Sequence, residues 1–299
     1  MEPKIHIPVM LKEVIDYLDL APGKTIIDAT MGTGGHSSTI AEKILPGGKL
    51  IGIDRDEESL AVSRQRLLQY GQGCVYVHGN FMDIDTILND AGVQKVDGVV
   101  FDLGISTFQL SDPQRGFSFQ SEGPLDMRLD RSSYISAYDL VNNLNEQEIS
   151  TLLWNFGQER WHNRIARFLV QEREKHPIAT TLQLANIVLR SVPARYRHHH
   201  YRIHPATRTF QAVRIAVNRE IETLEFAIDK AIEVLGKGGK ICVISFHSLE
   251  DRVVKHHFRR AAQEDLINII TAKPQTPRHS EVEENPACRS SKLRVAERK

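Results

Sequence analysis

Short apolar runs alternate with amphipathic stretches through the N-terminal third of the chain, and this alternation constrains the fold most strongly. Four apolar runs read as buried strands, at 24–30, 49–56, 74–80 and 96–106. The stretches between them have the apolar spacing of helices, at 36–45, 57–70 and 81–92. Strands that alternate with helices form mainly parallel sheets covered on both faces. The sequence therefore predicts an α/β fold.

The alternation stops after Ser106, where a segment rich in glycine, proline, serine and charge follows. From Ala137 to Arg190 the pattern is helical without a strand signal, and 207–235 reads as one long helix. Strand patterns return at 240–248, 266–272 and 291–297.

We therefore predict a sheet domain that an insertion interrupts. The sheet domain comprises residues 1–108 and 204–299, and the insertion at 109–203 is all-helical.

Composition narrows the setting of the protein. The formal net charge is zero, so no global charge draws the chain to nucleic acid or to an anionic membrane. The three cysteines lie far apart without a CxxC pair, which predicts neither a zinc site nor a disulfide framework. We see no secretory signal and no membrane-spanning run, so we expect a cytoplasmic protein without a membrane partner.

A glycine-rich turn follows the first predicted strand and opens the first predicted helix of the sheet. Its glycines are Gly32, Gly34 and Gly35. Bare amides at a helix N-terminus let a ligand approach the backbone closely. Dinucleotide-binding turns read GxGxxG, whereas the sixth position here is Ser37, so the match is poor.

Acidic residues point to a cationic ligand instead. Asp28 precedes the glycine turn, Asp54 ends the second strand, and Asp102 ends the fourth. Ligands of open α/β sheets bind beyond the carboxyl ends of the strands. Three acids at three such ends suit S-adenosylmethionine, which carries a sulfonium. An acid that binds the ribose hydroxyls, as Asp54 could, is shared by both ligand classes and does not discriminate between them.

Several long strings resemble one known family. They include DATMGTGGHS, HPATRTFQAVRIAVN, ISFHSLEDR and NPACRSSKLR, and the similarity runs from His6 to Arg298. The chain resembles the RsmH (MraW) family of bacterial S-adenosylmethionine-dependent methyltransferases, which modify N4 of a cytidine in small-subunit 16S ribosomal RNA near the decoding centre. The resemblance implies a class I, Rossmann-like methyltransferase fold in which the helical insertion recognises the substrate.

The resemblance also implies a set of cofactor contacts. They are Gly34, Gly35, His36, Asp54, Phe81, Asp102 and Gln109. The pattern of the strand ends adds Asp28 and Gly32 as further candidates.

An exocyclic amine is a poor nucleophile, so the site needs a hydrogen-bond acceptor that holds its hydrogens, and Asp102 is our candidate. Enzymes that methylate amino groups of DNA have a Pro-Pro-aromatic motif after this acid, and this chain has DLGIS instead. The aromatic ring that stacks on the base must then come from elsewhere. Candidates are Phe117, Phe119 and Phe246, and His247 is a candidate proton acceptor.

Two further features concern the loop and the RNA. Asp126 and Arg128 are expected to order the loop over the site. The 45 residues from Lys175 to Arg219 contain no acid. Within them, cations and aromatic rings are interleaved, which suits phosphate contact and base stacking. The predicted RNA contacts are Arg195, Tyr196, Arg197, Tyr201, Arg202 and Arg208.

Alternatives remain open at this stage. One is a methyltransferase that acts on DNA or on a small amine, and another is an rRNA-binding assembly factor without catalysis. The substrate is either naked 16S rRNA or the assembled 30S subunit. The oligomeric state is undetermined, with a homodimer among the options.

Overall fold

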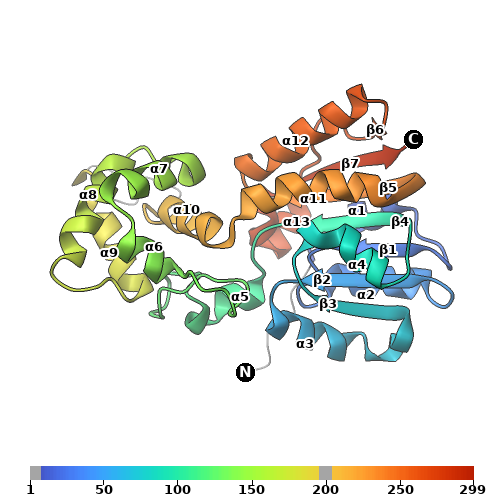
Figure 1. The fold of residues 1–299 in the computed structure, drawn as a ribbon, viewed down its shortest axis with the longest axis horizontal. Helices are drawn as coiled ribbons and strands as arrows, with labels where there is room; N and C mark the ends of the chain where they lie inside the picture. The colour runs from blue at the N-terminus through green and yellow to red at the C-terminus, as the bar shows by residue number, and fades with distance from the viewer. Residues whose placement is uncertain (1–7, 195–203) are drawn as a thin grey trace. The chain divides into compact units, whose positions relative to one another are not determined.

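A computed structural model describes residues 8–194 and 204–299. The chain forms two compact units (Figure 1). The sheet unit contains the residues up to Ser106 and Ile221–Lys299, and the helical unit contains Thr107–Glu220.

One sheet of seven strands is formed by the described residues of the sheet unit, in the order β3-β2-β1-β4-β5-β7-β6. Strands β1 to β5 are parallel, whereas β7 is antiparallel to both β5 and β6. The bounds are β1 Thr25–Asp28, β2 Lys49–Asp54, β3 Cys74–His78, β4 Val96–Asp102, β5 Leu235–Ser245, β6 Ile267–Ile269 and β7 Lys292–Arg298. The predicted mainly parallel sheet is confirmed.

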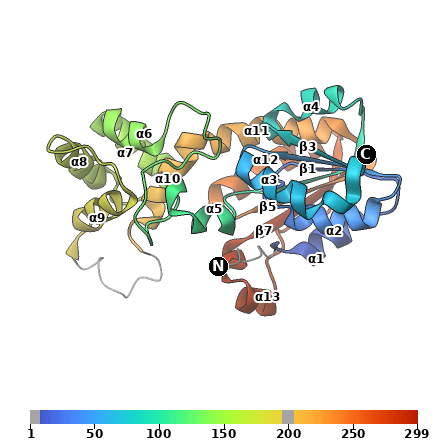
Figure 2. The same cartoon turned by 90° about the horizontal axis from the view of Figure 1, so that it is seen from below.

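Helices cover both faces of this sheet, and Figure 2 shows α4 and α11 on one side with α1 and α2 on the other. Successive strand residues alternate between two cores, because side chains of a strand alternate in direction. Ile26 packs toward α1 and α2, and Ile27 packs toward α11 and α12. The helices of this unit are α1 Leu11–Leu18, α2 Gly35–Ile44, α3 Glu57–Arg66, α4 Ile84–Asp90, α11 Glu220–Val234, α12 Ser248–Gln263 and α13 His279–Glu284.

The register of the parallel strands brings their acidic ends to one edge. Asp28 is opposite Gly52, two residues before Asp54. Val100 is also paired with Asp28, and Asp102 follows two residues later. The three acids thus end β1, β2 and β4, which are neighbours in the sheet.

The helical unit contains helices α5 to α10 (Figure 1). Their bounds are α5 Thr107–Ser111, α6 Ala137–Asn143, α7 Glu146–Gly157, α8 His162–Arg173, α9 Thr181–Ser191 and α10 Thr207–Asn218. Helices α7 and α10 cross closely at Gly157, where a Cβ atom would lie 2.7 Å from the carbonyl oxygen of Arg208. A larger residue at Gly157 would force the two helices apart.

The single helix predicted over 207–235 is wrong. The structure breaks it into α10 and α11 at Arg219, whose backbone is left-handed with a φ of 50°. The Asn218 side chain donates to the carbonyl oxygen of Met127 at 2.8 Å and accepts from the amide of Leu129 at 2.8 Å. These hydrogen bonds tie the end of α10 to a loop of the helical unit.

The predicted boundary of the insertion moves for the same reason. Helix α10 packs on α7, so the helical unit ends at Glu220 rather than at residue 203. Its start at Thr107 lies two residues before the predicted position.

None of the helices in the described part of the chain is long and apolar enough to cross a membrane.

Candidate active site

The glycine turn between β1 and α2 requires glycine at its centre. Gly34 caps α2 with a φ of 80°, a left-handed conformation that other residues rarely adopt. A Cβ atom at Gly34 would lie 3.1 Å from Oγ of Ser63. Ser63 is held there because its hydroxyl donates to the carbonyl oxygen of Gly32 at 2.6 Å. The turn is therefore a tight cradle of backbone amides at the start of a helix.

Asp54 holds this turn from the neighbouring strand. Its Oδ2 accepts from the amide of Gly32 at 2.6 Å, and its Oδ1 accepts from the amide of Asp56 at 2.8 Å. Each carboxylate oxygen keeps a second lone pair that a ligand hydroxyl can use. Burial raises the pKa of Asp54 to about 6, although both amides oppose this shift.

Asp28 is a buried acid beneath the same turn. Its Oδ2 accepts from the Ser37 hydroxyl at 2.6 Å, and its Oδ1 accepts from the amide of Thr30 at 3.3 Å. Burial raises the pKa of Asp28 to about 6. Ser37, which weakened the dinucleotide pattern in the sequence, thus serves to bind this carboxylate.

Asp102 differs from the other two acids because one of its oxygens is unsatisfied. Its backbone amide donates to Oγ1 of Thr30 at 2.6 Å, which fixes the end of β4 beside β1. Its Oδ1 is buried and has no hydrogen-bond partner in the described structure. Burial, followed by the charges of Asp28 and Glu250, raises the pKa of Asp102 well above its ordinary value.

His36 is buried and faces this acid. Its Nε2 lies 3.0 Å from the carbonyl oxygen of Val9, which only accepts hydrogen bonds, so Nε2 carries a hydrogen. Its Nδ1 lies 3.6 Å from Oδ2 of Asp102. The imidazole therefore joins the segment before α1 to the acid at the end of β4.

The two other predicted cofactor contacts lie in different units. Phe81 opens a 3-10 turn, Phe81–Asp83, after β3, and its ring packs edge-on against Phe101 with centroids 5.5 Å apart. Gln109 is buried on α5 in the helical unit.

The predicted proton acceptor His247 has a structural role at the N-terminus of α12. Its Nδ1 accepts from the amide of Glu250 at 3.4 Å, and Glu250 accepts from the amides of Phe246 and His247 at 2.8 and 3.2 Å. This reciprocal pair is a capping box. Phe246 follows β5 directly and is half-buried.

The other aromatic candidates pack within the helical unit. Phe117 is buried beneath the Arg115 guanidinium. The Phe119 ring contacts the rings of His204 and Phe210 at centroid distances of 4.7 and 4.9 Å. These contacts use the rings for packing within the helical unit.

The predicted loop pair is present. Arg128 donates twice to the Asp126 carboxylate, at 2.9 and 2.7 Å, and also to the carbonyl oxygen of Ser133 at 2.6 Å. The pair therefore orders a loop of the helical unit. The side-chain hydrogen bonds hold the pKa of Asp126 below its ordinary value despite partial burial.

Two arginines of the acid-free stretch are paired with glutamates from outside it. Arg214 forms two hydrogen bonds to Glu220, both at 2.9 Å, and Arg190 lies 3.4 Å from Glu172. Arg208 is exposed and donates to the carbonyl oxygen of Gln158. The remaining predicted RNA contacts lie outside the described residues, namely Arg195, Tyr196, Arg197, Tyr201 and Arg202.

Sequence reasoning missed the residues that support the site. Thr30, Ser63 and Val9 hold Asp102, the glycine turn and His36 through contacts between distant parts of the chain. Spacing in the sequence carries no signal for such contacts.

The sheet order and the site together define a class of protein. A glycine turn, an acid that holds this turn and an acid with a buried, unpaired oxygen occupy the carboxyl ends of neighbouring parallel strands. The protein is a class I S-adenosylmethionine-dependent methyltransferase. The residues fit the cationic methyl donor, because three neighbouring acids with raised pKa values gain a counter-charge when a cation binds.

Comparison with known proteins identifies the family of the chain. A sequence model of the MraW methylase family matches residues 4–299, and the chain belongs to this family. A relative from Trichlorobacter lovleyi, named ribosomal RNA small subunit methyltransferase H, is 46% identical over 100% of this chain and 99% of its own length. A relative of the same name from Clostridium botulinum is 42% identical and covers 97% of each chain.

Proposed function

We propose that this enzyme transfers a methyl group from S-adenosylmethionine to the exocyclic N4 of a cytidine in small-subunit 16S rRNA, near the decoding centre. The full-length relatives named as small-subunit rRNA methyltransferases support the choice of RNA. The observation that carries the chemistry is the buried, unpaired Oδ1 of Asp102. Ribosomal RNA as substrate makes the cytoplasm the site of action.

The proposed cofactor site lies at the carboxyl ends of β1, β2 and β4 in the sheet unit. The contacts would come from Gly34, Gly35, His36, Asp54, Phe81 and Asp102, with Asp28 and Gly32 supporting the turn. When bound, S-adenosylmethionine supplies an electrophilic methyl on a positive sulfonium. The acids at the strand ends balance that charge, and the second lone pairs of Asp54 accept from the ribose hydroxyls.

Asp102 would position the acceptor amine. The N4 lone pair is delocalised into the cytosine ring, so attack requires that a hydrogen-bond acceptor hold an N4 hydrogen and favour pyramidal nitrogen. The unpaired Oδ1 offers this acceptor.

The proton released from N4 would also pass to Asp102. A carboxylate in water is a weak base, but burial raises the pKa of Asp102 well above its ordinary value. His36 presents Nδ1 at 3.6 Å from Oδ2, where it can stabilise the protonated acid or take the proton onward.

The helical unit would recognise the RNA. Arg208, exposed on α10, would contact phosphate, together with the predicted cations and rings of 195–202. Phe246 and His247 follow β5, and Phe246 would stack on an RNA base. The target base must leave its stack to reach a buried acid, as in other base-modifying enzymes. We propose the 30S subunit as the substrate, with a homodimer as an alternative to a monomer.

The test is methyl transfer from radiolabelled S-adenosylmethionine to 30S subunits that lack the modification and to naked 16S rRNA. Nucleoside analysis of digested RNA identifies the product, and fragment mapping gives its position. N4-methylcytidine on 30S subunits supports the proposal. Another methylated nucleoside would overturn the N4 assignment. RNA binding without any methylated product would favour the assembly-factor alternative.

A further inference from the structure

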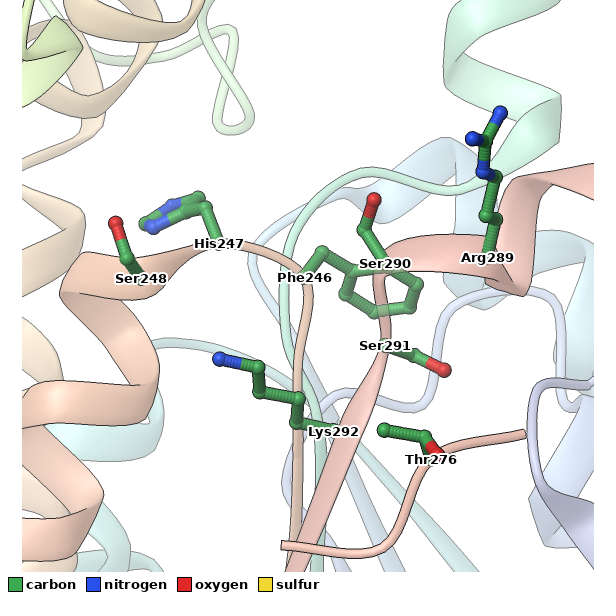
Figure 3. Close-up of a pocket in the computed structure, with 8 residues that line it drawn as sticks. All are labelled: Phe246, His247, Ser248, Thr276, Arg289, Ser290, Ser291 and Lys292. Carbon is green, nitrogen blue, oxygen red and sulfur yellow. The ribbon is translucent and has the colours of Figure 1, made fainter.

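A pocket of about 340 Å³ lies at the end of β5 and the start of β7. It is within the size range of small-ligand pockets. Figure 3 shows Lys292 reaching toward His247 and Ser248 at the start of α12, with Ser291 on the other side of β7 near Thr276. The full lining is Phe246, His247, Ser248, Thr276, Arg289, Ser290, Ser291 and Lys292.

The pocket adjoins the loop that follows Asp102. Ser245 pairs with Lys292 across β5 and β7, and Asp102 pairs with Ile244 across β4 and β5. A Cβ atom at Gly104 would lie 3.5 Å from the Phe246 ring. The ring therefore lies beside the loop two residues after Asp102, although Asp102 itself is not part of the lining.

Positive charge in the pocket is held in place. Asp251 of α12 accepts from Nε of Arg294 at 2.7 Å and from Nζ of Lys292 at 3.3 Å. Glu250 adds a second carboxylate at the amides of Phe246 and His247, and Arg289 adds a third cation in the lining, so these groups together carry net positive charge. Because α12 begins at Ser248, its positive dipole end adds to the attraction for an anion.

Ser291 supplies an independent sign of a ligand. The residue is 1% exposed, and its Oγ has no hydrogen-bond partner in the described part of the chain. A buried hydroxyl without a partner costs about 1–3 kcal/mol, so a ligand that pairs with it is favoured.

We propose that this pocket binds the ribonucleotide next to the acceptor cytidine in the RNA strand. Its base lies against Phe246, its phosphate contacts Lys292, and Ser291 pairs with a polar atom of the same nucleotide. The occupant is a neighbour rather than the acceptor because Asp102 does not line the pocket. The proposal rests on the proposed RNA substrate, which it extends to reading of the flanking nucleotide.

The first test compares Lys292→Gln with Lys237→Gln in methyl transfer to 30S subunits. Lys237 is exposed near the start of β5, whereas the pocket lies at the other end of β5. Loss of one phosphate contact should raise the KM for RNA about tenfold and lower the slope of log KM against log salt by about one. Lys237→Gln should change neither quantity, and Lys292→Arg should restore both.

The second test uses Ser291→Ala, with Thr271→Val as the contrast. Thr271 is also buried, but its Oγ1 accepts from the amide of Val295 at 2.8 Å. Ser291→Ala should keep the wild-type Tm and raise the KM for RNA by about threefold or more. Thr271→Val should lower the Tm and leave the KM for RNA unchanged.

A third variant, Phe246→Leu, tests whether Phe246 contacts the flanking nucleotide or the acceptor cytidine. We expect a higher KM for RNA with kcat nearly retained. A loss confined to kcat would overturn the proposal, since it would place the acceptor base on Phe246. An unchanged KM for RNA in Lys292→Gln and Ser291→Ala would also overturn it. Wild-type enzyme that methylates no rRNA would instead refute the proposed function itself.

Discussion

Asp28, Asp54 and Asp102 lie at the carboxyl ends of three adjacent strands, where Asp28 is buried and the other two are partly buried. Burial raises the pKa of Asp28 and of Asp54 to about 6. An acid whose pKa rises on folding stabilises the fold while it is protonated. That contribution is complete below the unfolded pKa of about 4 and is lost as the pH rises through about 6. Binding of a cationic ligand has the opposite pH dependence and strengthens as the pH rises, because the cation stabilises the charged carboxylates.

The affinity for S-adenosylmethionine should therefore depend on pH. From about pH 5 to about pH 7, we expect Kd to fall by about tenfold or more, because fewer protons must be released when the cation binds. Calorimetry in buffers of different ionisation enthalpy measures both Kd and proton release. A Kd that stays constant over this range would contradict the raised pKa values.

Gly34→Ala should impair cofactor binding more than its effect on folding explains. The left-handed φ costs about 1 kcal/mol for alanine, and the new Cβ would press on Ser63 at 3.1 Å. Gly92→Ala is the control, because Gly92 has a φ of +63° and open space around its Cβ position. Both variants should lose stability in thermal melts, whereas only Gly34→Ala should lose affinity for S-adenosylmethionine. Equal affinities in the two variants would contradict this assignment.

For individual residues, the sequence predicted which acids lie at one edge of the sheet but not the hydrogen bonds that each one makes. Parallel strands place their ends together, so Asp28, Asp54 and Asp102 could be assigned to one edge. The unpaired oxygen of Asp102 depends on every neighbour within hydrogen-bond reach. His36 is oriented by Val9, which precedes it by 27 residues. Such contacts depend on packing and leave no pattern in the sequence.

The element that follows β5 shows that one histidine can fit two different roles. A histidine in a loop after a strand fits a proton acceptor, and it also fits a helix N-cap. The structure shows the capping box between His247 and Glu250. His247→Ala should lower the free energy of unfolding by about 1 kcal/mol, and His247→Asn should restore it, because asparagine is a good N-cap.

Urea unfolding measures these differences, and the pH profile of kcat supplies the second readout. If the cap is the main role of His247, the profile of His247→Asn keeps its wild-type shape. A proton acceptor at this position would require a missing limb in the profile and a loss of about a hundredfold or more in kcat.

Helices were easier to predict than their ends. The apolar spacing continues from α10 into α11, so the sequence alone favours one helix over 207–235. The break at Arg219 depends on Asn218, which bonds to a loop about ninety residues earlier in the chain. The boundary of the helical unit follows from that tertiary contact and was therefore misplaced.

The whole molecule has no net charge, so RNA binding must depend on local charge. Arg208 and Arg214 lie on the same helix but differ in their surroundings. Arg208 is exposed, whereas the Arg214 side chain is 13% exposed and paired with Glu220.

Arg208→Gln should therefore weaken binding to 30S subunits severalfold and lower its salt dependence, with the Tm unchanged. Arg214→Gln should lower the Tm, because Glu220 loses its partner, and should leave the salt slope of binding intact. Filter binding across a salt series and thermal melts measure both quantities. A lower salt slope in Arg214→Gln and a lower Tm in Arg208→Gln would contradict these two roles.

The role of Asp102 is the central claim, and the rate of a single round of methyl transfer by Asp102→Asn tests it most directly. Asparagine keeps the shape of the side chain but cannot take a proton. We predict that the rate falls by about a hundredfold or more, while the affinity for S-adenosylmethionine, measured by calorimetry, changes by less than about tenfold. A rate close to that of the wild type would contradict the account.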